Sequence, residues 1–410
     1  MSRRVVITGL GVVSPLGNSI DQFWDGLKNG KSGIDKIERF DVSEYKTQIA
    51  GEVKDFDFSE YLTRKDAKRM DRYTQFAVVA AGNALKDSEI DMDSVDLEKF
   101  GTILGCGIGG IETLEKQHKR LLKRGPNRVS PFLIPMMISN MASGHVSMNF
   151  GLKGPNTTVV TACASATNAI GDAYHVIKRG DADFMLSGGT EASITPIGMS
   201  GFCTMKAMSK RNDEPKKASR PFDKDRDGFV MAEGSGILVL EEYEHAKKRN
   251  AKIYGEVVGF GYTSDAHHIT APAPGGEGAA RSMKMAIENA NIKPSDIDYI
   301  NAHGTSTPLN DKFETLAIKS VFKDHAYNLS INSTKSMTGH LLGASGAIES
   351  IAMCLQMKNS YIHKTLNHEN PGKDLDLDYV PNGKEKQITY ALSNSLGFGG
   401  HNATLILKKL

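Results

Sequence analysis

Short apolar runs alternate with longer helical patterns along most of the chain, and this alternation limits the fold more than any other feature of the sequence. The candidate strands are Arg4–Thr8, Phe100–Leu104, Thr157–Thr161, Phe184–Leu186, Ile237–Glu241, Ile253–Phe260, Ile297–Asn301 and Ala403–Leu407. The candidate helices are Tyr73–Asp87, Ile111–Lys123, Ala164–Lys178, Gly278–Asn291 and His340–Met357. Strands separated by helices favour an α/β fold whose sheets are covered by helices. A charged helix over residues 241–250 precedes the strand at Ile253, so we expect two halves, 1–251 and 252–410.

The composition is that of a large globular protein. Of the 410 residues, 40% are hydrophobic and 24% are charged, which provides enough apolar material for an extensive core. The sequence contains no run of about 18 apolar residues and no sustained apolar stretch near its start, so we expect no membrane-spanning helix. The net charge of +2 and the short basic patches argue against nucleic acid as a partner. Four well-separated cysteines indicate a reducing compartment, so we expect a cytoplasmic protein.

Cys163 stands where an apolar run ends and a run of small residues begins. The segment Thr157–Thr161 (TTVVT) predicts a short buried strand, and a helical pattern follows from Ala164 to Gly180. A cysteine at a helix N-terminus meets a partial positive charge and free backbone N–H groups, which favour the thiolate. Most unpaired cysteines are packed thiols, so the surroundings of Cys163 alone leave both interpretations open.

The two halves carry a loose internal echo. The segments TACASATNAIGDA and TGHLLGASGAIES each place one reactive residue, Cys163 or His340, two positions after a threonine and at the head of a small-residue helix. Such an echo often arises by chance. It gains weight only if independent features point to a duplicated fold.

Two short motifs resemble ligand-binding loops but lack the residues that would complete them. The segment GCGIGG follows a strand and precedes a helix, as in a dinucleotide-binding fold, yet no acidic residue stands about 20 positions further on. The segment DKDRDGFVMAE begins like a calcium loop, but Gly234 occupies the place of the bidentate glutamate. We therefore expect a tight glycine turn and no calcium site, and an NAD-dependent oxidoreductase stays a remote alternative.

Three other segments carry reactive or polar groups. NAHGTSTPLND places His303 directly after a strand, and STKSMTGHLLGASGAIES holds Lys335, His340 and Glu349 among small and apolar residues. NSLGFGGHNA is a glycine-rich turn whose backbone N–H groups can face a ligand. Taken singly, these features also suit a hydrogen-bonded loop histidine, a structural ion pair and an ordinary turn.

Together the segments suit one type of reaction. A thiolate attacks thioesters readily, and the oxyanion that forms needs N–H donors, for which the amide of Cys163 and one from the GFGG turn are candidates. Two neutral imidazoles can stabilise a second negative charge, such as an enolate formed by decarboxylation. The hydroxyls of Thr305 and Thr307 suit a polar, amide-bearing substrate arm. A cysteine protease would instead need one histidine and an orienting Asn or Asp.

The same segments resemble a known enzyme family over essentially the whole chain. TACAS, NAHGTSTPLND, STKSMTGHLLGASG and NSLGFGGHNA are similar to motifs of the β-ketoacyl-[acyl-carrier-protein] synthases in their Cys–His–His branch, as are RRVVITGLGVVSPLG, SRPFDKDRDGFVMAEG and NATLILKKL. The elongating synthases of bacterial type II fatty acid synthesis look closest, with type I and polyketide ketosynthases as near relatives. The resemblance implies a thiolase-like α/β fold with two pseudo-duplicated halves in a five-layered αβαβα sandwich, and a homodimer.

The resemblance also implies a role for each site residue. Cys163 would hold the acyl chain as a thioester, and His303 and His340 would assist the decarboxylation of malonyl-carrier protein, whose enolate attacks the acyl-enzyme. The supporting residues would be Lys335, Glu349 and Asp311. Cys163 and Phe398 would form the oxyanion hole and gate. The acyl pocket and the pantetheine arm would contact Ile108, Phe202, Thr305, Thr307 and Gly399.

Partners and ions are implied in the same way. Docking of the acidic acyl carrier protein would fall to Lys65, Lys68, Arg69, Arg128 and Lys206. No cofactor is required, although some family members hold Na⁺ or K⁺ near residues that match Asn301, Glu349, Ser393 and Asn394. Leu396 replaces a phenylalanine of many bacterial relatives without loss of a chemical group. Chain-length factors, which are non-catalytic partners in this family, carry glutamine in place of the nucleophile, so the presence of Cys163 disfavours that role.

Overall fold

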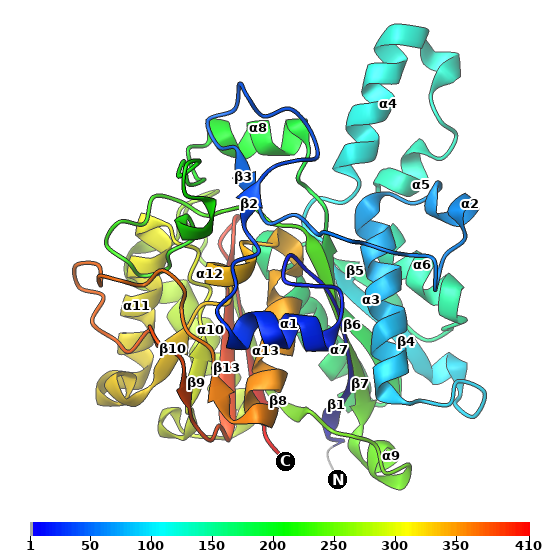
Figure 1. Ribbon diagram of the computed structural model, residues 1–410. Coiled ribbons are helices and arrows are strands. Elements are labelled where there is room, and N and C mark those ends of the chain that lie inside the picture. Colours follow the sequence, from blue (N-terminus) through cyan, green and yellow to red (C-terminus); the bar gives the residue numbers. More distant parts are fainter. Residues whose placement is uncertain (1–2) are drawn as a thin grey trace.

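The computed structural model describes residues 3–410, and its core is one ten-stranded sheet (Figure 1). The strands follow in spatial order as β10 (Ser330–Asn332), β9 (Tyr299–Asn301), β13 (Tyr390–Gly397), β14 (His401–Lys408), β8 (Gly255–Ser264), β1 (Val5–Val13), β7 (Gly234–Glu242), β6 (Phe184–Glu191), β4 (Phe100–Gly105) and β5 (Asn156–Val159). Two small sheets lie apart from it, formed by β2 (Asp35–Lys36) with β3 (Ile49–Ala50) and by β11 (Tyr361–Ile362) with β12 (Lys384–Glu385).

The strand order repeats within the large sheet. Counted along the chain, β5, β4, β6, β7 and β1 lie in the order third, second, fourth, fifth, first, and β10, β9, β13, β14 and β8 lie in the same order. The directions match as well, because in each repeat the first three neighbours are parallel and the last two pairings are antiparallel. The repeats meet where β1 pairs antiparallel with β8, with Val5 opposite Val257. The duplicated α/β fold predicted from the sequence is confirmed.

Helices and sheet form five layers. α7 (Ser165–Arg179) and α13 (Ser345–Asn359) pack against each other and against both halves of the sheet, so they form the central layer. α3 (Arg72–Ser88) and α6 (Met141–Phe150) cover the outer face of the first half, and α10 (Glu277–Ala290) and α11 (Pro308–Phe322) cover that of the second (Figure 1). Residues 345–357 of α13 are all buried, because this helix has sheet on both sides.

The remaining helices lie around this sandwich. They are α1 (Ile20–Lys28), α2 (Arg64–Ala67), α4 (Ile111–Arg124), α5 (Leu133–Met137), α8 (Pro196–Thr204), α9 (Tyr243–Lys248) and α12 (Lys335–Thr338). α2, α4, α5 and α8 project at the upper end in Figure 1. Across residues 3–410, no helix combines the length and the apolar character needed to cross a membrane.

The two central helices approach each other closely because small residues lie at their contact. A Cβ atom on Gly346 would come within 2.0 Å of the Oγ1 atom of Thr167, so a larger residue does not fit there. Thr167 in turn shares a hydrogen bond of 2.7 Å with the hydroxyl of Ser395 on β13. The contact joins α7 to α13 near their N-terminal ends, which are preceded by Cys163 and His340.

Two segments differ from the sequence-based expectation. The buried strand expected at residues 157–161 is instead the edge strand β5, whose residues are exposed or half-buried because, within residues 3–410, it pairs only with β4. The helix expected from His340 begins at Ser345, after a 3-10 turn over Leu342–Ala344. His340 cannot enter the helix because its main chain forms a bridge to Met231.

The structure also changes the register of the internal echo. Each central helix follows a three-residue 3-10 turn and begins with a serine. The residues that open the two turns share a left-handed φ, which is +50° at Ala162 and +48° at Leu342. The structural counterpart of Cys163 is therefore Gly343, and the expected correspondence between Cys163 and His340 is wrong by three residues.

Candidate active site

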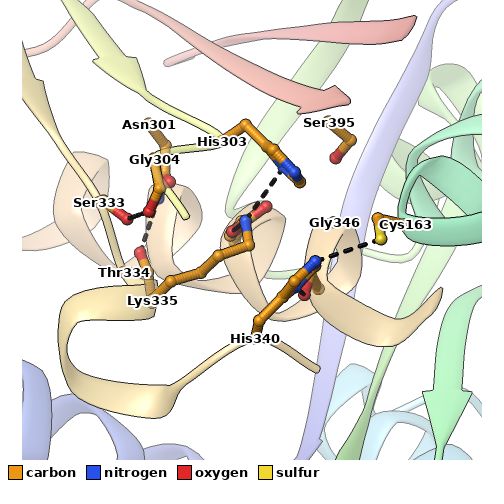
Figure 2. A network of polar contacts seen from close by, with 12 residues as sticks. Cys163, Asn301, His303, Gly304, Ser333, Thr334, Lys335, His340, Gly346 and Ser395 are labelled. Carbon is orange, nitrogen blue, oxygen red and sulfur yellow. Dashed lines mark hydrogen bonds and ion pairs between the residues drawn. The ribbon is translucent and has the colours of Figure 1, made fainter. Parts of the chain in front are cut away.

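Cys163 lies in the 3-10 turn Ala162–Ala164 at the N-terminus of α7. The residue is only 8% exposed, and Ala162 before it has a left-handed φ of +50°. Strained backbone of this kind is held in place by the surrounding structure and clusters at functional sites. The Nε2 atom of His340 lies 3.2 Å from the Sγ atom of Cys163 (Figure 2).

Main-chain contacts hold His340 beside the thiol. Its N–H donates to the carbonyl of Val230 at 2.7 Å, and its carbonyl accepts the N–H of Ala232 at 2.8 Å. The Nδ1 atom lies 2.9 Å from the hydroxyl of Ser345, the first residue of α13. When Nδ1 carries the proton and donates it to Ser345, Nε2 has a free lone pair directed at the thiol.

His303 follows β9 in the second half and faces His340. The centroids of the two imidazole rings are 5.3 Å apart, and the rings are nearly perpendicular, at 87°. The Nζ atom of Lys335 lies 3.3 Å from Nδ1 of His303 (Figure 2). It also forms an ion pair with Glu349. Because an ammonium group can only donate, Nδ1 of His303 must accept, and the ring proton therefore sits on Nε2.

Burial keeps both histidines neutral. It lowers the pKa of His303 and of His340 well below the ordinary value, and the positive charge of Lys335 lowers both pKa values further. Burial also raises the pKa of the Glu349 carboxyl group to about 7, against the opposing effect of Lys335. The site therefore presents two uncharged N–H donors or acceptors in surroundings where electrostatic interactions are strong.

Burial has the opposite effect on the cysteine. It raises the pKa of the Cys163 thiol to about 12, while Lys335 and the backbone N–H of Phe398 act in the opposite direction. The sequence predicts a thiolate at this helix N-terminus, but the apolar pocket keeps the resting thiol protonated. The proton must therefore leave as the thiol reacts, and Nε2 of His340 is the acceptor within reach.

The glycine-rich turn between β13 and β14 closes one side of the site. Gly399 and Gly400 have left-handed φ values of +84° and +75°, which this tight turn requires. The backbone N–H of Phe398 faces the thiol of Cys163 and acts to lower its pKa, and a Cβ atom on Gly397 would come within 3.1 Å of the Cys163 nitrogen. The amides of Phe398 and Cys163 thus lie on the same side of the site and are the candidates for an oxyanion hole.

A largely apolar cavity of about 400 Å³ opens at Cys163 and is lined by residues of both halves. The residues predicted from the sequence that line it are Cys163, Phe202, Lys206, His303, Thr305, Thr307, His340 and Phe398. The hydroxyls of Thr305 and Thr307 are 2.9 Å apart. Ile108 and Gly399 do not line this cavity. Ile108 is 36% exposed, and Gly399 donates its N–H to the carbonyl of Ile269. An acyl-pocket role for either residue stays a prediction.

Asp311, predicted as a supporting residue, contacts a neighbouring loop and does not contact Cys163, His303 or His340. Its buried carboxylate accepts the N–H of Phe222 at 2.8 Å and lies 3.6 Å from the guanidinium of Arg226. Both contacts belong to the segment that leads to Val230, the main-chain partner of His340. Asp311 can therefore influence His340 only through the main chain of this segment.

Sequence analysis does not identify two residues that touch the histidines. Glu314 on α11 accepts the N–H groups of His303 and Gly304 at 2.8 Å each, and burial raises its pKa to about 7. Phe229 places its ring edge-on to that of His340, with centroids 5.4 Å apart. A glutamate on the buried face of a helix is the one signal for Glu314. Phe229 stands within the segment SRPFDKDRDGFVMAEG, but nothing in that segment singles it out.

The residues predicted for a monovalent cation include three buried side-chain atoms that have no hydrogen-bond partner in the described structure. These atoms are Oδ1 of Asn301, Oε2 of Glu349 and Oγ of Ser393. Asn301 and Ser393 are register partners on the parallel strands β9 and β13. The side chain of Asn394 is already bonded to α11 and β14, so it offers only its main chain. Oxygen atoms without donors fit a cation, and water is the other candidate.

Clusters of stronger metal ligands are not found in the part of the chain that the structure covers. No group of three or more His, Cys, Asp or Glu side chains there could hold a metal ion. The segment that resembles a calcium loop is occupied internally, because Asp223 bonds to Arg220 and accepts the N–H groups of Asp225, Glu369 and Asn370.

The predicted docking residues are exposed and form two groups. The first group lies on or directly after α2 and after α4, and consists of Lys65, Lys68, Arg69 and Arg128. Lys206 follows α8 and lines the cavity that contains Cys163. Figure 1 places α2 and α8 on opposite sides of the upper end of the molecule.

Comparison with known domains covers nearly the whole chain. The beta-ketoacyl synthase N-terminal domain matches residues 2–246, and the beta-ketoacyl synthase C-terminal domain matches residues 254–369. The chain belongs to the β-ketoacyl synthase family.

Named relatives and solved structures are similar to this β-ketoacyl synthase in sequence and in fold. The 3-oxoacyl-[acyl-carrier-protein] synthase 2 of Synechocystis sp. is 54% identical over 99% of the chain and 98% of the relative. The protein of the same name from Staphylococcus aureus strain COL is 52% identical over 100% of the chain and 99% of the relative. Two structures align with full coverage of both chains: the AntDE:AntF complex of a type II polyketide acyl carrier protein with its ketosynthase (TM-score 0.93, 38% identity) and a beta-ketoacyl synthase from Burkholderia phymatum (0.92, 35%).

The raised pKa of Cys163 predicts an unusual pH dependence of alkylation. The rate with iodoacetamide should rise about tenfold per pH unit up to about pH 10 without a plateau, because the thiolate reacts and the thiol pKa is about 12. Peptide mass spectrometry measures the rate at Cys163 in a Cys203→Ser background, since Cys203 is the other cysteine with exposed surface. Lys335→Met removes a charge that lowers this pKa and should slow alkylation at every pH. A plateau near pH 8 would contradict the assignment.

Proposed function

We propose that the chain is an elongating 3-oxoacyl-[acyl-carrier-protein] synthase of type II fatty acid synthesis. It joins malonyl-acyl carrier protein to an acyl chain held on Cys163 and releases CO2 and a 3-oxoacyl-carrier protein that is two carbons longer. The observation that carries the proposal is the 3.2 Å contact between Cys163 and His340, with His303 facing the same cavity. Full-length relatives named 3-oxoacyl-[acyl-carrier-protein] synthase 2, at 54% and 52% identity, support this substrate class.

The first half-reaction transfers the acyl chain to Cys163. As Sγ attacks the thioester carbonyl, Nε2 of His340 accepts the thiol proton. The N–H groups of Cys163 and Phe398 donate to the oxyanion, which collapses as the carrier thiolate leaves. The imidazolium of His340 returns the proton to that leaving sulfur, so the histidine is neutral again for the second half-reaction.

The second half-reaction uses both histidines as neutral donors. The Nε2 proton of His303 is held in place because Lys335 occupies Nδ1. Loss of CO2 from the malonyl thioester leaves an enolate, whose oxygen accepts a hydrogen bond from Nε2 of His303. Nε2 of His340 donates as well when its ring proton lies on Nε2 and Nδ1 accepts the hydroxyl of Ser345. The enolate carbon attacks the acyl thioester on Cys163, the carbon–sulfur bond breaks, and the departing cysteine thiolate takes up one proton from solvent, which balances the loss of the malonyl carboxylate as CO2. The lowered histidine pKa values mean that both rings enter this step neutral.

Polyketide ketosynthases are the second candidate class, supported by the likeness to the AntDE:AntF ketosynthase. The identity to that protein is 38%, against 54% for the relative from Synechocystis, and we therefore favour fatty acid elongation. A non-catalytic role in the manner of a chain-length factor is disfavoured because the cysteine is present. The reaction depends on a reduced thiol, which suits the cytoplasm.

Acyl carrier protein would dock at the end of the molecule where the cavity opens. An acidic carrier suits the exposed basic residues on both sides of that end, and Lys206 lines the cavity itself. The AntDE:AntF structure contains a carrier protein bound to its ketosynthase, which supports a partner of this class.

A second copy of the chain would cover an apolar surface around β5. Phe132, Ile134, Ile138, Met148 and Val160 are 37–65% exposed, and β5 has an unpaired edge within residues 3–410. We therefore predict a homodimer with twice the chain mass of 44.5 kDa, measured by light scattering after gel filtration. Val160→Glu should weaken the dimer, and a single-chain mass for the unchanged protein would contradict the proposal.

The carrier-dependent reaction is tested by intact mass. After mixing with acyl-carrier protein of medium chain length, the protein should gain one acyl group, and malonyl-carrier protein should then remove it as a chain two carbons longer. Cys163→Ala should gain no acyl group, and His303→Ala should be acylated but should release product at least about 100-fold more slowly, because it lacks one enolate donor.

Charge reversal separates docking from chemistry in the same assay. The pair Lys65→Glu and Lys68→Glu should slow acylation by carrier protein while iodoacetamide still reacts with Cys163 at the wild-type rate. Acylation of Cys163→Ala to the wild-type extent would overturn the assignment of the nucleophile.

The unpartnered oxygen atoms predict stabilisation by a monovalent cation. We propose that Asn301, Glu349 and Ser393 hold K⁺ or Na⁺, so the melting temperature should be higher in KCl or NaCl than in choline chloride of equal ionic strength. Asn301→Ala should abolish this difference, whereas Gly201→Ala, a control with open space around it, should retain it. Equal melting temperatures of the unchanged protein in all three salts would exclude the cation.

A further inference from the structure

Glu191, the last residue of β6, is a fully buried carboxylate that the proposed reaction does not use. Its two oxygen atoms accept hydrogen bonds only from groups that are not charged. Oε2 accepts the N–H of Gly107 at 2.8 Å and that of Gly343 at 3.1 Å. Oε1 accepts the N–H of Ile108 at 3.2 Å and the hydroxyl of Ser193 at 3.3 Å.

The glycines around Glu191 leave room for nothing larger than hydrogen. A Cβ atom on Gly107 would meet Oε2 at 2.7 Å, and one on Gly343 would meet the same oxygen at 2.8 Å and the nitrogen of Gly107 at 2.3 Å. Gly107 belongs to the GCGIGG segment that resembles a dinucleotide loop. Its N–H groups therefore bind an internal carboxylate where a nucleotide loop would bind phosphate.

Glu191 joins the two halves at the level of the reacting groups. Gly343 is the counterpart of Cys163 in the second half, and it directly follows Leu342, which lines the cavity. Gly107 lies on the other side, where its Cβ position is 3.6 Å from the carbonyl of Ala162, the residue before Cys163. One carboxylate therefore joins the GCGIGG loop, which lies beside Ala162, to the turn that follows His340.

The position of Leu342 in the cavity wall depends on the Glu191 carboxylate more than the position of His340 does. The main chain of His340 is held separately by Val230 and Ala232. Leu342, by contrast, has a left-handed φ of +48°, which a leucine adopts only when its neighbours are fixed. It packs in the same apolar cluster as Cys163, Ile194 and Met199.

We propose that Glu191 is a positioning residue that fixes Leu342 in the wall of the cavity at Cys163 and thereby sets how long an acyl chain Cys163 can hold. The inference rests on the proposed function, because it concerns the acyl chain of that reaction. Five N–H, O–H and S–H groups face the carboxylate, namely those of Gly107, Ile108, Gly343, Ser193 and Cys106. A glutamine side chain in place of Glu191 would point its NH2 group, which cannot accept a hydrogen bond, at some of these donors.

The experiment compares chain-length profiles of Glu191→Gln and wild type. Acylation of Cys163 is followed by intact mass with carrier proteins bearing about six and about fourteen carbons, and the ratio of kcat/KM for the long over the short chain is determined. Glu191→Gln should lower this ratio at least about fivefold, because a displaced Leu342 obstructs the cavity beyond the reacting atoms. Acylation by the short chain should stay near the wild-type rate.

A matched control separates positioning from general stability. Glu241→Gln alters another fully buried glutamate, on the neighbouring strand β7, where it bonds to Arg249 and His245 far from the cavity. It should lower the melting temperature and leave the chain-length ratio unchanged. Gly107→Ala, which presses on Oε2 from the other side, is a second variant and should shift the ratio in the same direction as Glu191→Gln.

The outcomes distinguish this inference from the proposed function. A wild-type ratio in either folded variant, or an equal loss for both chain lengths, overturns the role of Glu191 in chain-length selection. A wild-type protein that takes up no acyl chain overturns the proposed function, and the inference that rests on it falls as well.

Discussion

The close contact of α7 and α13 in the middle of the sandwich is the interaction on which the rest of the structure depends. Gly346 against Thr167 brings the two helices together near their N-terminal ends, and the sheet encloses them on both sides. The turns that precede these helices carry Cys163 and the segment after His340. Cys163 is held by the turn that opens α7, and His340 is held by main-chain bonds to the buried residues Val230 and Ala232, so the 3.2 Å distance between thiol and imidazole is maintained by the core and not by a surface loop.

Burial then determines the chemistry of the groups that the helices bring together. In apolar surroundings a charge is costly, so the thiol stays protonated and the histidines stay neutral. The buried pair Lys335 and Glu349 is the exception, since each charge offsets the other. The ammonium of Lys335 donates a hydrogen bond to Nδ1 of His303, so one buried ion pair also decides that Nε2 of that histidine carries the proton.

Sequence patterns predicted the parts of this site that depend on local order. The alternation of strands and helices indicated the α/β class, and the small residues after Cys163 indicated a helix. Cys163 and His340 were identified at the head of small-residue helices, His303 directly after a strand, and Lys335 among small and apolar residues, and the family resemblance then implied their roles. Glu314 was not identified, since its role is to accept main-chain N–H groups of a distant segment, and a contact of this kind leaves no mark in local sequence.

The sequence by itself determined the α/β class and the candidate reactive side chains, because periodicity and residue type are properties of neighbouring positions, and the family resemblance added the duplication. Only the tertiary structure decided the register of the duplication, in which Gly343 and not His340 corresponds to Cys163. It also decided the protonation of the thiol and the ligand of the GCGIGG loop, an internal carboxylate. These features depend on burial and on contacts between residues far apart in the chain, which arise only when the two halves close around the central helices.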